Sequence, residues 1–207
     1  MNRIIIILVF GLAIPLFGSG GYDHGTSTGK GQLELDFTWN PFNIIDFGQS
    51  YLVIGYGLTG RLDVHGYYSR QTDNQDNYYY GIFYQFFDKK YLDLATAIGK
   101  RHYTVSKTND LFFPQLLYNI KISKELTIGG AFVNIQRISD NALHPRGTAF
   151  DIALYIPLSN AVKLPNYIDE IKLVLGIFNP GVFESDHGKF LPTYSIDITF
   201  KKFFSNK

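Results

Sequence analysis

The sequence predicts an all-β protein, a transmembrane antiparallel up-and-down β-barrel of about 10 strands (between about 8 and 12) after an N-terminal signal peptide. Three observations predict it: apolar and polar residues alternate through most of the chain, long and short connections alternate, and the chain starts with an export signal. The composition agrees, because 16% of the residues are aromatic, 18% are charged and the net charge is +1. These values argue against a disordered chain, a coiled coil and a nucleic-acid-binding protein.

Residues 1–20 have the layout of a cleaved secretory signal peptide. A positively charged start and an apolar run from Ile4 to Ile14 precede a cluster of small residues. The run is shorter than the ~20 residues that a membrane-spanning helix needs, which favours cleavage after Gly20 over a retained anchor. We therefore expect residues 21–30 to be a short periplasmic N-terminal segment and residues 31–204 to form the barrel.

The period of two defines the strands, because successive side chains of a strand point to opposite faces of the sheet. In residues 32–39, for example, Leu33, Leu35 and Phe37 alternate with polar residues. About ten such segments follow one another, each near the 9–11 residues that cross a bilayer when tilted. Their apolar sets begin, in chain order, at Leu33, Leu52, Leu62, Tyr80, Leu92, Phe112, Leu126, Phe150, Ile171 and Tyr194.

Three tight turns give a separate test of these faces, because antiparallel partners across a hairpin share one face. If the two apolar residues that flank each turn are paired, the residues further along both strands pair apolar with apolar. The closing pairs are Leu58 with Leu62, Phe86 with Leu92, and Ile122 with Leu126. Val133 and Ile135 carry apolar character onto the other parity, which suggests a β-bulge near Phe132.

Alternation alone does not say which face of the barrel points inward, but the connections do. With the N-terminus in the periplasm, every odd connection is extracellular and long, whereas three of the four even ones are tight turns. Transmembrane barrels show this asymmetry, whereas a soluble meander has no reason for it. The longer connections are 40–50, 71–77, 100–110, 139–146 and 180–190, the tight turns are 59–61, 87–91 and 123–125, and the exception is 159–170.

This orientation divides the strand residues into two groups. Charged and polar side chains face the lumen, with as many as six carboxylates that need partners. The expected lumen-lining residues are Glu34, Asp36, Asp63, His65, Asp93, Arg101, Lys121, Asp151, Lys172, Asp197 and Lys201, with Gln85, Gln115 and Asn119. The expected lipid-facing residues are Leu35, Phe37, Ile54, Tyr56, Leu94, Leu116, Ile152, Leu173 and Ile196.

Two stretches resemble small bacterial outer-membrane β-barrel proteins. Tyr56-Gly57-Leu58-Thr59-Gly60-Arg61-Leu62-Asp63 resembles a periplasmic turn of that family, and the end of the chain, up to Phe204, resembles its aromatic-ended last strand. In the family the aromatic residue is usually terminal, whereas here three residues follow it. The resemblance implies an outer-membrane location, contact with membrane lipid and lipopolysaccharide, and insertion by the barrel-assembly machinery. It implies no particular activity.

Catalytic residues are not expected, although Ser185, Asp186 and His187 lie together in one predicted outer loop and His144 lies in another. Neighbours on a loop do not establish a Ser-His-acid geometry, and such residues are also ordinary loop residues. The sequence contains no cysteine and no motif for a metal or cofactor, so we expect neither.

The predicted function is therefore that of a narrow small-solute channel or a structural or surface-interaction protein of the outer membrane. A barrel of about ten strands lies closer in size to barrels filled by side chains than to open porins, so a filled lumen and a narrow path both remain open. Two alternatives also remain: a lipid-modifying hydrolase with histidines in its loops, and a soluble exported lipocalin-like carrier.

Overall fold

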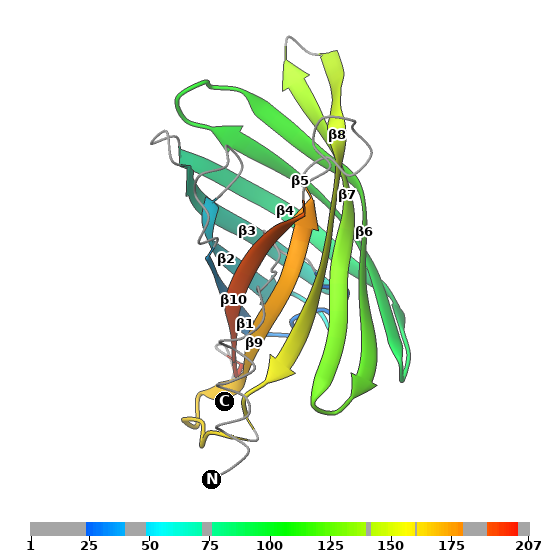
Figure 1. Ribbon diagram of the computed structural model, residues 1–207, viewed down its shortest axis with the longest axis vertical. Coiled ribbons are helices and arrows are strands. Elements are labelled where there is room, and N and C mark those ends of the chain that lie inside the picture. The colour runs from blue at the N-terminus through cyan, green and yellow to red at the C-terminus, as the bar shows by residue number, and fades with distance from the viewer. Residues whose placement is uncertain are drawn as a thin grey trace.

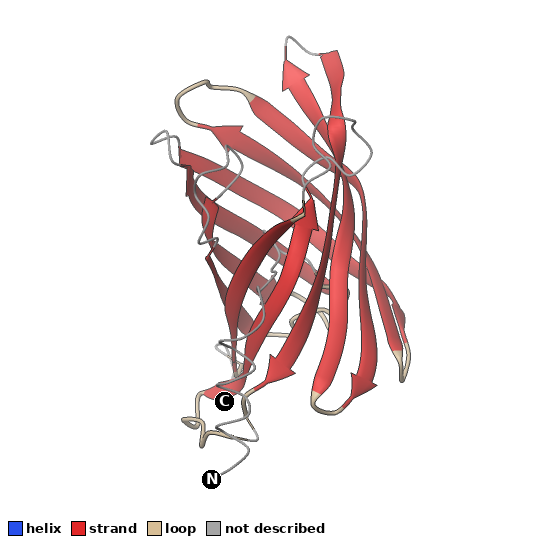
Figure 2. Cartoon of the chain, in the orientation of Figure 1, coloured by secondary structure: helices blue, strands red, loops and turns tan. Residues whose placement is uncertain are grey.

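The chain folds into a closed barrel of ten antiparallel strands, which confirms the predicted fold class (Figures 1 and 2). The computed structural model describes residues 24–39, 49–71, 76–139, 142–159, 161–179 and 190–202. None of the helices among these residues is long and apolar enough to cross a membrane. The strands are β1 (Leu33–Trp39), β2 (Gln49–Gly57), β3 (Leu62–Gln71), β4 (Asp76–Asp88), β5 (Leu92–Tyr103), β6 (Asn109–Ser123), β7 (Leu126–Ser139), β8 (Ala142–Pro157), β9 (Ile168–Asn179) and β10 (Leu191–Phe200).

Neighbouring strands pair in chain order, and β1 pairs with β10 to close the sheet. The closing register runs from Leu33 opposite Phe200 to Trp39 opposite Tyr194, and it places Asp36 directly opposite Asp197. A closed sheet has no edge strand, so the ladder satisfies the backbone N–H and C=O groups within the wall.

The predicted outer apolar set lies on the outside of this wall, and the predicted lumen carboxylates lie on the inside. Phe37 and Ile54 are 48% and 45% exposed, whereas Asp36, next to Phe37 in β1, is 9% exposed. Asp63 and Asp93 are completely buried. This arrangement is incompatible with a lipocalin-like carrier, which would line its interior with the apolar set.

Two of the three predicted hairpin registers are confirmed along the strands. Tyr56 pairs with Val64 across the β2–β3 turn, and Ile120 pairs with Ile128 across the β6–β7 turn. The predicted closing pair of the second turn is wrong, because Leu126 pairs with Ser123 after a register shift and not with Ile122. The predicted β4–β5 register is wrong by two residues, because Tyr84 pairs with Thr96 and the register shifts between Gln85 and Phe87. A slip of two residues leaves every side chain on the same face, so alternation cannot detect it.

The predicted bulge is not at Phe132 itself but close to it. Pairing of β7 with both neighbours continues through Phe132 without a shift, opposite Leu116 and Phe150. The register with β6 shifts between Phe112 and Gln115, opposite Ile135 and Val133, and the register with β8 shifts between Ile135 and Gln136. Val133 is buried because it is an apolar residue of the inner face.

At the end of the barrel away from the tight turns, the strands are longer than the sequence predicts. As a result, two predicted long loops are mostly strand: residues 104–108 connect β5 to β6, and residues 140–141 connect β7 to β8. We call the end that contains the turns 58–61, 89–91 and 124–125 the short-turn end. The predicted lumen residue Lys201 lies just after β10 and is exposed, because the strand ends at Phe200.

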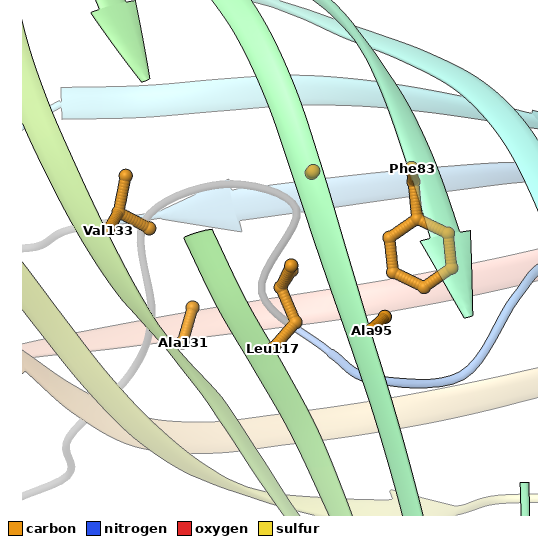
Figure 3. Packing of buried hydrophobic residues seen from close by; sticks show 6 residues of the cluster. Phe83, Ala95, Leu117, Ala131 and Val133 are labelled. Atoms are coloured by element: carbon orange, nitrogen blue, oxygen red, sulfur yellow. The ribbon is translucent and has the colours of Figure 1, made fainter. Parts of the chain in front are cut away.

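Apolar and aromatic side chains pack against one another on the lumen side of β2 to β7. Figure 3 shows Phe83, Leu117 and Val133 from three different strands close together, with two alanines between them. A second group continues around the wall, in which Tyr67 stacks on Tyr79 at 5.0 Å between ring centroids. This side of the lumen is therefore packed, and we call these two groups the lumen belt: Phe83, Ala95, Ala97, Leu117, Ala131, Val133, Tyr51, Val53, Tyr67 and Tyr79.

Replacing Leu117 by alanine should lower the free energy of unfolding by about 2–5 kcal/mol, because it leaves a cavity in the lumen belt. Its neighbour Leu116 provides a matched control, since it points outward and is 43% exposed. Leu116→Ala should cost less than about 1 kcal/mol, as is usual for surface substitutions. Urea unfolding of the refolded barrel in detergent measures both values, and equal losses would contradict a packed lumen.

Candidate functional site

A short N-terminal segment lies inside the short-turn end of the barrel. Residues 24–31, which we call the plug segment, precede β1 and run across the mouth to the end of β2. There the N–H of Gly31 donates to the carbonyl of Gly57 at 2.7 Å. A side chain at Gly57 would collide with the backbone of Gly29, so only glycine allows this approach.

Polar side chains on four strands hold the plug segment. Its residues from Gly25 to Thr28 are small, and each forms a hydrogen bond with a side chain of the inner face. The bonds are Gly25 N–H to Asn119 Oδ1 (3.3 Å), Thr26 Oγ1 to Asp93 Oδ2 (2.6 Å), Ser27 N–H to Gln85 Oε1 (2.9 Å), Thr28 N–H to Asp63 Oδ2 (2.7 Å) and Asn119 Nδ2 to Thr26 Oγ1 (2.6 Å). The plug segment thus supplies donors to carboxylates that the barrel buries, as burial of a charge requires.

Cations complete the neutralisation of these carboxylates. The ammonium of Lys121 lies 2.8 Å from the carboxylate of Asp93, which also accepts the Thr26 hydroxyl. His24, at the start of the plug segment, lies 3.3 Å from Glu34 of β1. The hydroxyl of Thr28 donates to the same Glu34 carboxylate at 3.1 Å.

His24 titrates in the environment of several charges. Burial lowers its pKa, but the charge and hydrogen bond of Glu34, aided by Asp197, outweigh burial and the opposing charge of Lys172. The pKa of His24 is therefore raised above its ordinary value. Protonated His24 is the form that binds Glu34, so protonation favours a seated plug segment.

Two carboxylates face each other at the closing seam of the barrel. Asp36 of β1 and Asp197 of β10 are cross-strand partners, and the hydroxyl oxygen of Ser195 lies within hydrogen-bond distance of both carboxylates, so that its one proton serves either of them. Thr38 donates a further hydrogen bond to Asp36 at 2.9 Å. The ammonium of Lys172, which pairs with Glu170 at 3.0 Å, interacts electrostatically with Asp197. This network keeps the seam polar on its inner side.

A cavity of about 640 Å³ lies beside the plug segment at the short-turn end. Its lining contains positively charged side chains, such as Lys121 and Lys172, and negatively charged ones, such as Glu34 and Glu170. Tyr155 adds an aromatic wall, and its ring lies edge-on to His24 at 6.1 Å between centroids. The cavity is large enough for a small polar solute.

The structure places the predicted lumen residues as follows. Eleven are buried, Lys121 and Lys172 are half-buried, and Lys201 is exposed. Five of the buried ones bind the plug segment: Glu34, Asp63, Gln85, Asp93 and Asn119. Elsewhere in the lumen, His65 lies 3.1 Å from the hydroxyl of Tyr79, and Asp151 accepts the N–H of Ala131 at 2.6 Å. The buried ones are Glu34, Asp36, Asp63, His65, Gln85, Asp93, Arg101, Gln115, Asn119, Asp151 and Asp197.

The predicted lipid-facing residues all have outward exposure. Phe37, Ile54, Leu116 and Ile196 are exposed, and Ile196 reaches 47%. The remaining five are half-buried among outer neighbours: Leu35, Tyr56, Leu94, Ile152 and Leu173.

Of the residues considered for catalysis, Ser185, Asp186 and His187 lie outside the described residues. His144 is exposed in β8, where its cross-strand partner is Arg137. Within the part of the chain that the structure describes, no three histidine or acidic side chains are grouped so that they could hold a metal ion.

Sequence reasoning missed the plug segment as part of the barrel interior. Residues 21–30 were expected only as a short periplasmic segment, and a signal was available in residues 25–31. That stretch has three glycines, small hydroxyl residues and no apolar residue, and so it fits a narrow polar lumen better than a strand or helix.

Comparisons with known proteins give little beyond this. No family model and no curated protein matches the chain. Among solved structures, "KdgM porin" matches with 7% identity and a TM-score of 0.45, over 82% of this chain and 98% of that chain. "KdgM porin in complex with disordered oligogalacturonate" matches with 8% identity, the same TM-score and the same coverage. A likeness of this size carries no functional argument.

Proposed function

We propose that this protein is an outer-membrane β-barrel that acts as a narrow small-solute channel, whose periplasmic mouth the plug segment closes. The observation that carries the proposal is the seating of residues 24–31 inside the short-turn end, on side chains of four strands. A segment held in a mouth in this way is a candidate gate.

The outer surface supports the membrane location. Large apolar and aromatic side chains are exposed around the wall, and a water-soluble protein rarely exposes so continuous an apolar surface. Tyr80 and Ile82 of β4, for example, are 59% and 51% exposed. The tight turns of the short-turn end match the periplasmic end of such barrels, and residues 1–20 would supply export.

The chemistry of the plug segment supports reversible closure. Between Gly25 and Gly31 it contains no apolar side chain, so hydrogen bonds rather than apolar burial hold it there. Each neutral hydrogen bond contributes about 0.5–1.5 kcal/mol net, and each bond to a charged group about 1.5–3 kcal/mol. Segments with few buried apolar contacts open more easily than the strands around them.

The lumen wall indicates where a solute would pass. Bulky residues of the lumen belt occupy the side formed by β2 to β7. The inner face of β1 and β8 to β10 carries a smaller apolar cluster, Ala153, Tyr155 and Val174, together with small or hydroxyl residues. The small or hydroxyl residues are Thr38, Gly176, Thr193 and Ser195. The proposed path follows this wall.

A second candidate function follows from the lumen belt itself. If its packing seals the barrel even without the plug segment, the chain is a non-conducting structural or surface-interaction protein. The first prediction below separates the two functions.

Tethering the plug segment should abolish conductance. The hydroxyl of Ser27 donates to the carbonyl of Gly60 at 2.8 Å, and a side chain at Gly60 would meet open space. Because the sequence has no cysteine, Ser27→Cys with Gly60→Cys supplies the only two thiols of the chain, and their disulfide forms once the exposed turn 58–61 shifts to bring the two Cβ atoms together, since no Ser27 atom lies within 4 Å of a Cβ at Gly60. Planar-bilayer recordings should show channel steps in the reduced protein and none in the oxidised protein.

The controls are the two single-cysteine variants under the same oxidant, which should conduct as the reduced double variant does. Equal conductance in both redox states would refute gating by the plug segment. Silence in both states would establish the sealed barrel as the correct function.

A charge on the outer face should destabilise the barrel only if that face meets lipid. Ile82→Arg should lower the free energy of unfolding in phospholipid vesicles by about 2–4 kcal/mol, because the bilayer interior does not solvate a guanidinium. Val105, 71% exposed in the 104–108 turn, is the matched control, and Val105→Arg should have little effect. A small effect at both positions would contradict the membrane assignment.

Gating should depend on pH through His24. Since the pKa of His24 is raised, its contribution to seating is complete below about pH 6.5 and is lost as the pH rises through the raised pKa. Channel opening in planar bilayers should therefore become more frequent with rising pH, and His24→Gln should remove this dependence. His144→Gln, a histidine of the opposite end, should retain it, and a pH response that persists in His24→Gln would exclude the mechanism.

A further inference from the structure

At the end opposite the plug segment, one buried carboxylate holds three guanidinium groups. Asp110 of β6 is completely buried. Its Oδ2 accepts Arg101 Nη2 at 2.7 Å, and its Oδ1 accepts Arg137 Nε at 3.0 Å and lies 3.5 Å from Arg146 Nη1. We call Arg101, Arg137 and Arg146 the arginine cluster.

The charges of this group do not cancel. Three guanidiniums remain protonated at any physiological pH, so together with Asp110 they carry a net charge of +2. At the plug end, by contrast, Lys121 and Asp93 form a one-to-one pair. An excess of two partly desolvated cations is unfavourable unless an anion compensates it.

Aromatic rings fix the position of the guanidiniums. The ring centroid of Tyr103 lies 4.8 Å from Cζ of Arg101, 5.9 Å from that of Arg137 and 5.8 Å from that of Arg146. Phe112 contacts Arg101 in the same way at 4.7 Å. Cation–π contacts of this kind hold the cations in place before any ligand arrives.

The cluster has donors to offer. The side chain of Arg101 is 10% exposed and is occupied with Asp110, whereas those of Arg137 and Arg146 are 31% and 37% exposed. Each guanidinium has five N–H donors in a planar fork, which suits the paired oxygens of a carboxylate or phosphate. Arg137 and Arg146 each use one nitrogen on Asp110, so part of each fork is free to face solvent.

We propose that Arg137 and Arg146, held over Asp110 and Tyr103, bind a multivalent oxyanion, a carboxylate or phosphate group of a solute that enters this end of the barrel. Only the statement that this site faces the outside of the cell rests on the proposed function, because anion binding itself requires no conduction.

Isothermal titration of the folded barrel in detergent, with citrate and with inorganic phosphate at constant chloride, tests the site. We expect binding of at least one of them, and Arg137→Gln with Arg146→Gln should weaken it at least about tenfold. Asp110→Asn should instead tighten anion binding, since it removes the carboxylate that competes for the arginines. Arg70→Gln is the matched control, because Arg70 pairs with Asp76 at 4.0 Å on β3 and β4 rather than with Asp110.

Each outcome is decisive. Binding of citrate alone or phosphate alone assigns the group that the site prefers. Binding of neither, or an equal loss in Arg70→Gln, overturns the proposal. If Asp110→Asn fails to fold, the double arginine variant still decides, because its side chains are partly exposed. A silent bilayer recording together with normal anion binding would reject the channel and leave this site intact.

Discussion

The closure of β1 onto β10 determines how the rest of the interior is organised. A closed sheet with an apolar outer face turns every alternate side chain inward, and in this chain many of those side chains are acidic. A carboxylate inside a narrow barrel keeps its charge only if donors or cations replace the lost water. The protein provides these partners in three ways along the lumen, with N–H and hydroxyl donors from the plug segment, lysines near it, and the arginine cluster at the other end.

These partners also give the lumen different properties at its two ends. Of the side chains that bind the plug segment, three are carboxylates, Glu34, Asp63 and Asp93, and the donors of the plug segment supplement the lysine and histidine that pair with them. In the arginine cluster, by contrast, three cations share the single carboxylate of Asp110. Between them the lumen belt has no charge. Along the proposed path, the arginine cluster comes first, the apolar lumen belt second, and the carboxylates that bind the plug segment last.

The sequence predicts the wall of this barrel well and its contents poorly. Alternation assigns Asp36 inward and Phe37 outward because a strand has only two faces. It could not detect the slip between β4 and β5, where Tyr84 meets Thr96, because a shift of two preserves both faces. It also misplaced Asp110 in a loop, since the irregularity between Phe112 and Gln115 reverses the parity before that residue. The plug segment follows no period, and its partners are distant in sequence, so only the folded barrel reveals it.

The anchoring of the plug segment sets an order of events during assembly. The segment is joined covalently to β1, yet its hydrogen-bond partners belong to β3, β4, β5 and β6, up to 94 positions away along the chain. Its seat does not exist until the sheet has curled far enough to bring those strands around the first one. Residues 24–31 are thus the first part of the described chain to be synthesised and among the last to reach their final place.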